Sequence, residues 1–161
     1  MILGKETIKR FLDQTQKYAD ENSGCCKVAV GSCIKLKDKK LSVYGANITL
    51  PVSCRKEGCR RIELYGEDSK NHRLPSDCRS LHSEVTAIAE AARFGLSLRG
   101  ATIFVTRYPC EACARAIVQS GISTVYYGRQ QVIPEEAQKI FDAGGVKVIH
   151  VNDWTYDDTE R

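Results

Sequence analysis

The sequence predicts an α/β fold in which a five-stranded mixed sheet lies inside a three-layer α-β-α sandwich. Apolar residues recur at helical spacing in four segments, and short runs rich in Val, Ile, Tyr and Cys stand between them. The order is one helix, two strands, and then three helix–strand pairs. A short polar turn joins the first two strands, which predicts an antiparallel hairpin. Helices join the last three strands, which predicts parallel pairing.

The first half of this order begins with a helix over residues 5–21, where Ile8 and Leu12 share one apolar face. Val, Cys and Ile are then concentrated in two runs, which is typical of strands. We expect these strands on either side of a polar turn, over residues 25–36 and 41–48.

The second half alternates helices with strands. Glycine follows each of its three helices, and Pro stands at the start of the last two, in agreement with the residue preferences of helix ends. In order, the expected elements are helix 81–94, strand 101–106, helix 110–120, strand 124–127, helix 134–143 and strand 146–151.

Residues 51–80 show neither the helical nor the strand period. They contain two Pro, two Gly, three Cys and many charges. A long irregular segment in a compact domain is usually functional, or is held by something other than an apolar core. No repeat or linker interrupts the chain, so residues 1–161 are expected to form one domain, with 51–80 as an inserted Cys-containing loop.

Composition limits the class of protein. The 161 residues are 42% hydrophobic, with no apolar run near the roughly 20 residues that a membrane span needs. Charged residues follow the first few positions, which argues against a secretory signal and predicts a cytoplasmic protein. Eight cysteines in a reducing compartment indicate metal binding rather than disulfides. The net charge of +4 suits either a phosphate-bearing small molecule or weak nucleic-acid contact.

Two short motifs stand at the starts of two successive helices: His82-Ser83-Glu84 and, 24 residues later, Pro109-Cys110-Glu111-Ala112-Cys113. In this topology both helix starts are expected at one edge of the sheet. One imidazole and two thiolates fill three of the four tetrahedral positions of zinc and leave the fourth open for water, as in a catalytic site. The sequence therefore predicts a catalytic zinc held by His82, Cys110 and Cys113.

Glu84 lies two residues beyond the histidine, where it faces the open position rather than binding the metal. A zinc-bound water has a pKa near 7, so a carboxylate is a sufficient base. We expect Glu84 to take a proton from this water and deliver it to a ring nitrogen and to departing ammonia. The motif pair matches the general signature of zinc deaminases, H-x-E followed by P-C-x-x-C.

Over roughly residues 5–150 the chain resembles the cytidine/deoxycytidylate deaminase superfamily, and in particular the deoxycytidylate (dCMP) deaminases of bacterial and phage type. Besides the two motifs, the similar segments are residues 27–32, 45–47, 78–84, 100–106 and 114–122. The resemblance implies a cytidine-deaminase-like fold and a zinc hydrolase of pyrimidine nucleotide metabolism that converts dCMP to dUMP. Many members are hexamers regulated by dCTP and dTTP, so it also implies a homo-oligomer and these two effectors.

The chain departs from the family pattern at several positions. The usual H-A-E-x-N-A is His82-Ser83-Glu84-Val85-Thr86-Ala87 here, so Ser83 replaces Ala and Thr86 replaces Asn. Lys27 stands where the family often has Arg, and it still offers charge to a phosphate.

Three residues are expected to contact the substrate. Asn47 is retained for a sugar or pyrimidine edge, and Lys27 is the candidate for the phosphate. Tyr126 and Tyr127 end a strand at the edge where ligands bind in open α/β sheets. Alternation places one in the core, and we expect Tyr127 to be the exposed one, available to the substrate.

The inserted loop is expected to hold a second metal. Four residues separate Cys54 from Cys59 within it, and Cys78 stands four positions before His82. Several dCMP deaminases that the chain resembles have a structural zinc in this region, and a loop without a core needs such a link. His72 is the first candidate for the fourth ligand. Cys25, Cys26, Cys33, water or a carboxylate remain alternatives, as do three free thiols.

Three other functions remain open at this point. The motifs equally suit a deaminase of another nucleoside, base or heterocycle, or one that edits tRNA or single-stranded DNA. A polynucleotide substrate would favour a stronger basic groove, whereas the C-terminal residues 152–161 contain four acidic side chains. A zinc-bound regulator without turnover is the last alternative, although Glu84 would then have no role.

Overall fold

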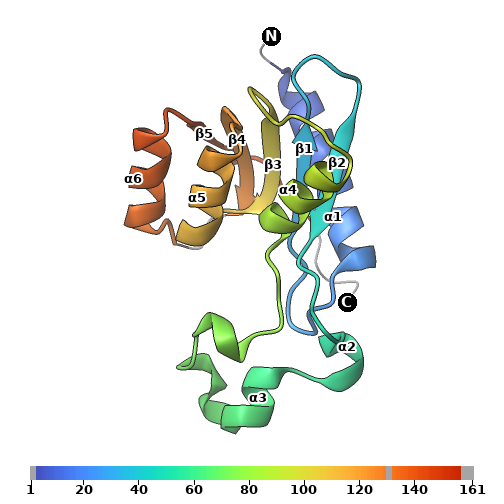
Figure 1. Ribbon diagram of the computed structural model, residues 1–161, viewed down its shortest axis with the longest axis vertical. Helices are drawn as coiled ribbons and strands as arrows, with labels where there is room; N and C mark the ends of the chain where they lie inside the picture. The colour runs from blue at the N-terminus through green and yellow to red at the C-terminus, as the bar shows by residue number, and fades with distance from the viewer. Residues whose placement is uncertain (1–2, 130–131, 157–161) are drawn as a thin grey trace.

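The computed structural model describes residues 3–129 and 132–156, which form a sandwich with a projecting arm (Figure 1). The sheet has strand order β2-β1-β3-β4-β5. Its strands are β1 (Gly31–Lys35), β2 (Ser42–Ala46), β3 (Thr102–Arg107), β4 (Thr124–Arg129) and β5 (Lys147–His150). The long helices are α1 (Lys5–Asn22), α4 (Ser83–Arg93), α5 (Glu111–Gln119) and α6 (Glu135–Ala143). No helix in the described ranges is both long and apolar enough to span a membrane.

The predicted strand directions are confirmed. β1 pairs with β2 as an antiparallel hairpin, and β3, β4 and β5 are parallel to one another. β1 also pairs with β3 in antiparallel orientation, which joins the hairpin to the parallel half. The sheet is therefore mixed, and β2 runs in the same direction as β3.

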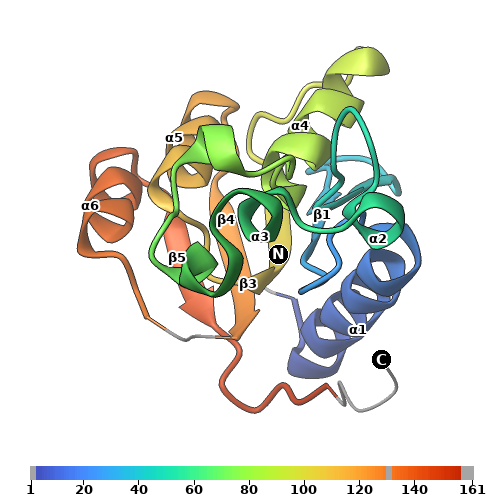
Figure 2. The ribbon, with the colours of Figure 1, turned by 90° about the horizontal axis from the view of Figure 1, so that it is seen from below.

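Helices cover both faces of the sheet, so the three-layer prediction is also confirmed. Figure 2 shows α1 on one side of the strands and α5 and α6 on the other. On the α1 face, Leu12, Cys33 and Phe104 belong to one buried cluster. On the opposite face, Ile103, Val105 and other strand residues pack with α4, α5 and α6 in a larger one. Alternate residues of β3 thus enter different cores.

The first strand is shorter than predicted because residues 25–30 are held by side-chain bonds rather than by a ladder. The Asn47 side chain accepts a hydrogen bond from the Val30 backbone N–H (2.9 Å) and donates one to the Val28 carbonyl oxygen (3.0 Å). Val, Cys and Ala at these positions suit a strand, but tertiary hydrogen bonds determine the local conformation here.

Residues 51–80, which we call the arm, project away from the sandwich (Figure 1). The arm contains two short α-helices, α2 (Cys54–Glu57) and α3 (Arg60–Tyr65), and two 3₁₀ turns, Gly66–Lys70 and Pro75–Asp77. The chain leaves and returns at one root, where the Leu50 N–H donates to the Arg79 carbonyl oxygen and the Leu81 N–H to that of Ile48. His82 follows the root directly, so the arm is attached beside the first predicted metal ligand.

Candidate active site

Two helix starts meet at one edge of the sheet and bring the two motifs together. Because β2 and β3 run in the same direction, the helices that follow them, α4 and α5, begin at the same edge. His82 is the N-cap of α4, Cys110 is the N-cap of α5, and Cys113 lies in the first turn of α5. Gly45 on β2 allows α4 to lie close, since a Cβ there would collide with the Ser83 carbonyl oxygen.

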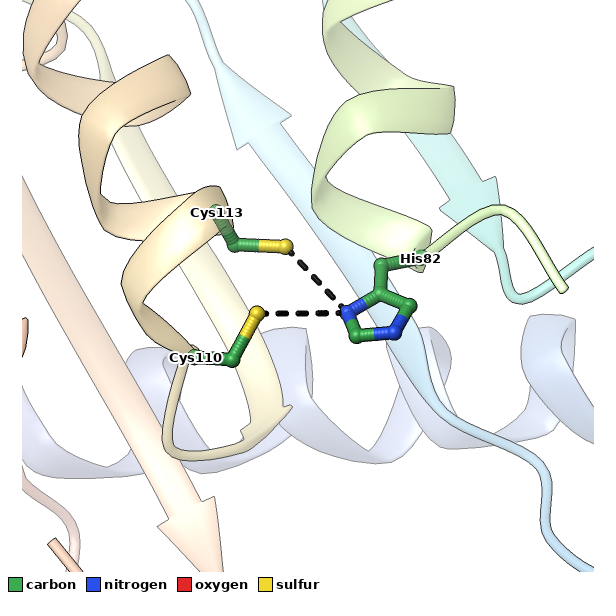
Figure 3. A group of neighbouring side chains, drawn as sticks. All are labelled: His82, Cys110 and Cys113. Atoms are coloured by element: carbon green, nitrogen blue, oxygen red, sulfur yellow. Dashed lines mark hydrogen bonds between the residues drawn. The ribbon is translucent and has the colours of Figure 1, made fainter. Parts of the chain in front are cut away.

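The three predicted ligands lie together as a three-donor site. The His82 Nδ1 atom is 3.4 Å from Sγ of both Cys110 and Cys113 (Figure 3). The three donor atoms lie within 4.8 Å of one another, and the described part of the chain contains no second such group of His, Cys, Asp or Glu. One imidazole nitrogen and two sulfurs suit zinc and leave one tetrahedral position open.

The electrostatics of the three-donor site prepare one of its three donors, Cys110, for a metal. A hydrogen bond from Cys113 lowers the pKa of Cys110 to about 3, and the His82 ring contributes in the same direction although burial opposes it. Donating that hydrogen bond, together with burial, raises the pKa of Cys113. The hydrogen bond to Cys110 raises the pKa of His82. One thiolate is therefore present at neutral pH, and a metal must displace the remaining protons when it binds.

Glu84 lies in the first turn of α4, where its carboxyl group is almost fully buried (4% exposed). Its Oε2 atom accepts a hydrogen bond from the Ser83 hydroxyl at 3.2 Å. Burial raises the pKa of Glu84, although its own backbone N–H and the charge of His82 oppose the shift. A carboxylate with a raised pKa, beside an open ligand position, has the properties of a general base and acid.

The predicted substrate contacts have different environments. Both polar atoms of the Asn47 side chain bind backbone groups of residues 28 and 30, so only one N–H and one lone pair remain for a ligand. Lys27 is exposed. The prediction that Tyr127 is exposed is wrong: it is 5% exposed and packs edge-on against Tyr108. Tyr126 is also buried, because helices cover both faces of the sheet.

Arg61, which lies on α3 in the arm, is a further candidate that no sequence pattern indicated. Its positive charge opposes the rise in the pKa of His82, so the guanidinium lies within electrostatic range of the three-donor site. Within residues 3–129 and 132–156, the Arg61 Nε atom is buried and has no hydrogen-bond partner. A buried guanidinium N–H that has no acceptor within the protein is available to a ligand. Residues 55–79 contain seven Lys and Arg, and no sequence signal distinguishes this one from the others.

The structure does not bring together the four donors predicted for the second metal. In the described ranges, the donor atoms of the three-donor site lie within 4.8 Å of one another. No three of the donors proposed for the second metal lie that close together, namely Cys54, Cys59, Cys78 and His72. The His72 ring instead stacks on Tyr65, with centroids 3.6 Å apart, and its Nε2 is 2.9 Å from Asp68 Oδ2.

Another thiol, Cys26, interacts electrostatically with two of the predicted ligands, Cys54 and Cys59. Burial raises the pKa of Cys26, and the charges of Cys25, Cys59 and Cys54 add to the effect. The pKa of Cys59 is lowered: burial opposes the shift, but the backbone N–H groups of Ile62 and Arg61 and the charge of Lys27 outweigh it. Thiols from residues 25–26 and from the arm therefore interact with one another.

Known proteins provide an independent comparison. Residues 5–129 match the model of the family described as the cytidine and deoxycytidylate deaminase zinc-binding region. The chain is 36% identical over 131 residues to ComE operon protein 2 of Bacillus subtilis, a match that covers 80% of this chain and 63% of that protein. It is 33% identical over 132 residues to the deoxycytidylate deaminase of Saccharomyces cerevisiae, covering 81% and 40%. The matches thus span less than two thirds of these relatives.

A solved structure supports the fold. The dCMP deaminase of cyanophage S-TIM5, crystallised with dCMP and dUMP, superposes with a TM-score of 0.69 at 22% sequence identity. The superposition covers 92% of this chain and 99% of that one. The cytidine-deaminase-like architecture expected from the sequence is therefore confirmed.

Proposed function

Because this chain belongs to the cytidine and deoxycytidylate deaminase family, we propose that it catalyses hydrolytic deamination of a cytosine nucleotide, with dCMP converted to dUMP and ammonia. The observation that supports this most is the position of buried Glu84 beside the three-donor site. His82, Cys110 and Cys113 would hold the zinc. Residues 1–161 would form a single deaminase domain, into which the arm is inserted.

The chemistry follows from the positions of these side chains. Zinc, when bound, lowers the pKa of a water molecule and makes it a nucleophile near neutral pH. The water oxygen bonds to C4 of the cytosine ring, and Glu84 moves one water proton to ring nitrogen N3. Glu84 then moves the second water proton to the amino group, the C4–N bond breaks, and ammonia leaves as the C4 carbonyl forms. No other proton donor is needed, because both protons come from the water.

The decisive experiment is to follow ammonia release from dCMP by the zinc-loaded protein and by its Glu84→Gln variant. The amide keeps the shape of the carboxylate but cannot accept the proton, so we expect turnover to fall at least about a thousandfold. Zinc content should stay the same, because Glu84 is not a ligand. No ammonia from any nucleotide with the unaltered protein would refute the proposed function, and loss of zinc in the variant would contradict the role of Glu84.

We propose that Arg61 and Lys27 bind the 5′-phosphate of the nucleotide. Arg61 has a buried Nε without a partner and acts electrostatically on His82, while Lys27 and Arg61 both act on Cys59. The two cations therefore approach the same place near the root of the arm. A guanidinium binds phosphate with two parallel hydrogen bonds, whereas a lysine supplies charge alone.

Kinetics with dCMP and with deoxycytidine test this assignment. Arg61→Gln should lower kcat/KM for dCMP about tenfold to a hundredfold, the usual cost of losing hydrogen bonds to a charged group. The same variant should leave deoxycytidine turnover unchanged, because that substrate lacks the phosphate. The matched control is Arg60→Gln, since Arg60 is the exposed neighbour on α3. An equal loss on both substrates would show that Arg61 does not bind the phosphate.

The same assay distinguishes the alternatives. Cytidine, guanine, dCTP, tRNA and single-stranded DNA would each be supplied in place of dCMP. Preference for a base or a polynucleotide would replace the dCMP assignment and still require Glu84. A protein that binds zinc but releases no ammonia from any of them would be a regulator without turnover.

We also propose a second, structural zinc at the root of the arm. Cys54 and Cys59 remain its first ligands, because both interact with Cys26. Cys26 or Cys25 replaces His72 as the preferred partner, since the His72 ring is bound to Tyr65 and Asp68. Cys78 remains the candidate for the remaining ligand. A metal count of two per chain supports this proposal, and a count of one removes it.

We further propose a homo-oligomer regulated by dCTP and dTTP, from the family resemblance, and a cytoplasmic location, from the charged residues near the N-terminus. Sedimentation or light scattering measures the mass in solution. Turnover of dCMP with and without each triphosphate tests the regulation. Unchanged kinetics would remove the effectors without affecting the proposed reaction.

A further inference from the structure

A buried pair of serine hydroxyls lies directly behind Glu84. The Oγ atoms of Ser32 and Ser83 are 2.7 Å apart, and Ser83 Oγ is 3.2 Å from Glu84 Oε2. Both serines are fully buried. Ser32 belongs to β1, where it pairs with Gly45 on one side and Val105 on the other, so it is fixed near the middle of the sheet. The carboxylate is thus linked through two hydroxyls to the most rigid part of the fold.

The direction of this chain of hydrogen bonds can be worked out from its members. The Ser83 hydroxyl donates its single proton to Glu84 Oε2, and the ionised carboxylate, which is the form that acts as a base, can only accept it. Ser83 then has only lone pairs left for Ser32, and the proton between the two serines must belong to Ser32. The donors therefore run from Ser32 to Ser83 to Glu84, and each hydroxyl strengthens the next.

We propose that Ser83, oriented by Ser32, is a positioning residue that holds Oε2 of Glu84 and leaves Oε1 to exchange protons with water and substrate. This inference rests on the deaminase function proposed above. With Oε2 occupied by a hydrogen bond throughout, the two successive transfers use the same oxygen and need no rotation of the carboxyl group. A fixed general base is a more effective one, because its reacting oxygen is already within reach.

The H-x-E motif itself does not require a serine at its middle position. Ser83 occupies the middle position of the H-x-E motif, where the family pattern has Ala. Ser83→Ala therefore restores the family sequence, so the variant is expected to fold and to bind zinc.

Kinetics of three variants test the proposal. Ser83→Ala should lower kcat for dCMP about tenfold with KM within about twofold, as expected when a hydrogen bond to a charged group is lost only at the reacting side chain. Ser32→Ala should lower kcat about threefold, because Ser83 can still donate without its own donor. The double variant should match Ser83→Ala alone, since Ser32 acts only through Ser83. Equal zinc content in all three shows that the metal site is intact.

Ser120→Ala is the control. Ser120 lies at the C-terminal end of α5, away from the metal ligands, and its hydroxyl also donates one internal hydrogen bond, to the Ile117 carbonyl oxygen at 2.8 Å. It should change thermal stability as the Ser83 variant does and leave kcat unchanged. A purely structural role for the pair predicts lower stability with unchanged kcat. If the decrease in kcat of the double variant equals the product of the two single decreases, the two serines act separately. Either result overturns the proposal.

A second readout does not require turnover. Crystal structures of the zinc-loaded protein and of Ser83→Ala should show one carboxyl orientation of Glu84 in the first and two or more in the second. A single, unchanged orientation in the variant would refute the positioning role even if the protein deaminates nothing. The failure of this inference is thereby distinguishable from failure of the proposed function.

Discussion

The edge of the sheet and the arm both contain cysteines with metal-ligand spacing, but only one of them has a formed site. At the sheet edge, His82, Cys110 and Cys113 lie within 4.8 Å of one another. In the arm, Cys54, Cys59 and Cys78 do not form such a group within the described ranges, and His72 stacks on Tyr65 instead. Similar residue patterns have therefore led to different degrees of preorganisation.

The difference lies in what supports each region. α4 and α5 pack on the sheet through fully buried side chains such as Ala87, Ala91 and Ile117, so their first turns are fixed by the core. α3 in the arm has no buried residue, and Ile62 and Leu64 are about half exposed. A segment without a core must be ordered by something else, such as a metal or a second chain. The packed core therefore positions the ligands at the sheet edge before any metal binds. In the arm, metal binding would itself have to order the segment that carries the ligands.

The largest effect expected from this comparison is the loss of catalysis when one ligand of the sheet-edge site is removed. Cys110→Ser should eliminate the catalytic zinc and lower turnover at least about a thousandfold, because the metal provides several kcal/mol of stabilisation to the reaction. The free energy of unfolding of the metal-free protein should change by less than about 1 kcal/mol, since the core is untouched. Metal analysis, ammonia release and urea unfolding measure the three quantities. Global unfolding of this variant would contradict preorganisation by the core.

Substitutions of large apolar residues should separate the two regions by stability. Phe104 is fully buried between Phe11 and Tyr126, with ring centroids 4.5 and 5.3 Å apart, so Phe104→Ala should cost about 4 kcal/mol. Ile62→Ala in the arm should change the free energy of unfolding by less than about 0.5 kcal/mol, because the side chain is half exposed. Urea unfolding at low protein concentration measures both. A large cost for Ile62→Ala would mean that another chain covers the arm.

Much of the sheet could be predicted from sequence because its signals are local and mutually consistent. Apolar periodicity located the four long helices, and the short turn before β2 and the helices between β3, β4 and β5 gave the strand directions. The three-donor site followed from the same reasoning, since helices after strands of one direction start at one edge. These elements depend on nearest-neighbour patterns along the chain, which a sequence displays directly.

The errors arose where a long-range contact determines the outcome. Tyr127 was assigned to the surface by strand alternation, but helices cover both faces, so both of its neighbouring positions are buried as well. The role of His72 stays a prediction: its residue type made it the first candidate for a fourth metal ligand, and its ring stacks on Tyr65 within the arm. Arg61 escaped notice because the burial of its Nε atom without a hydrogen-bond acceptor is a property of three-dimensional packing.

Two cysteine thiols, one in the sheet and one in the arm, have pKa values that are shifted in opposite directions. Burial in the sheet raises the pKa of Cys33 to about 11, whereas the pKa of Cys59 in the arm is lowered. Between pH 9 and 11 only the unfolded Cys33 thiol ionises, so the unfolded state binds fewer protons than the folded state. The stability from this group is fully present below pH 9 and is lost as pH rises to about 11, by about 2 kcal/mol in total.

Urea unfolding of the unaltered protein and of Cys33→Ala between pH 8 and 11 checks this prediction. The variant should be less stable at pH 8, because a core side chain is shortened, but its stability should fall less steeply over the interval. Parallel slopes in the two proteins would assign the pH dependence to other groups, of which Tyr44 is the first candidate because burial raises its pKa to about 12.

The smallest expected effect concerns the order of the arm itself. Cys54→Ser should reduce the zinc count from two to one per chain and make cleavage within residues 51–80 roughly tenfold faster under limited proteolysis, since local opening no longer has to release a metal. In this variant kcat/KM for dCMP should fall only to the extent that Arg61 is displaced from the phosphate. KM should therefore rise while kcat is retained.

Two further variants, Cys26→Ser and His72→Ala, identify the remaining ligand. We expect the first to behave like Cys54→Ser and the second to retain two zinc ions. If both variants keep two ions and an intact arm, the arm is ordered by contacts other than a metal, and the contrast with the sheet edge lies in packing alone.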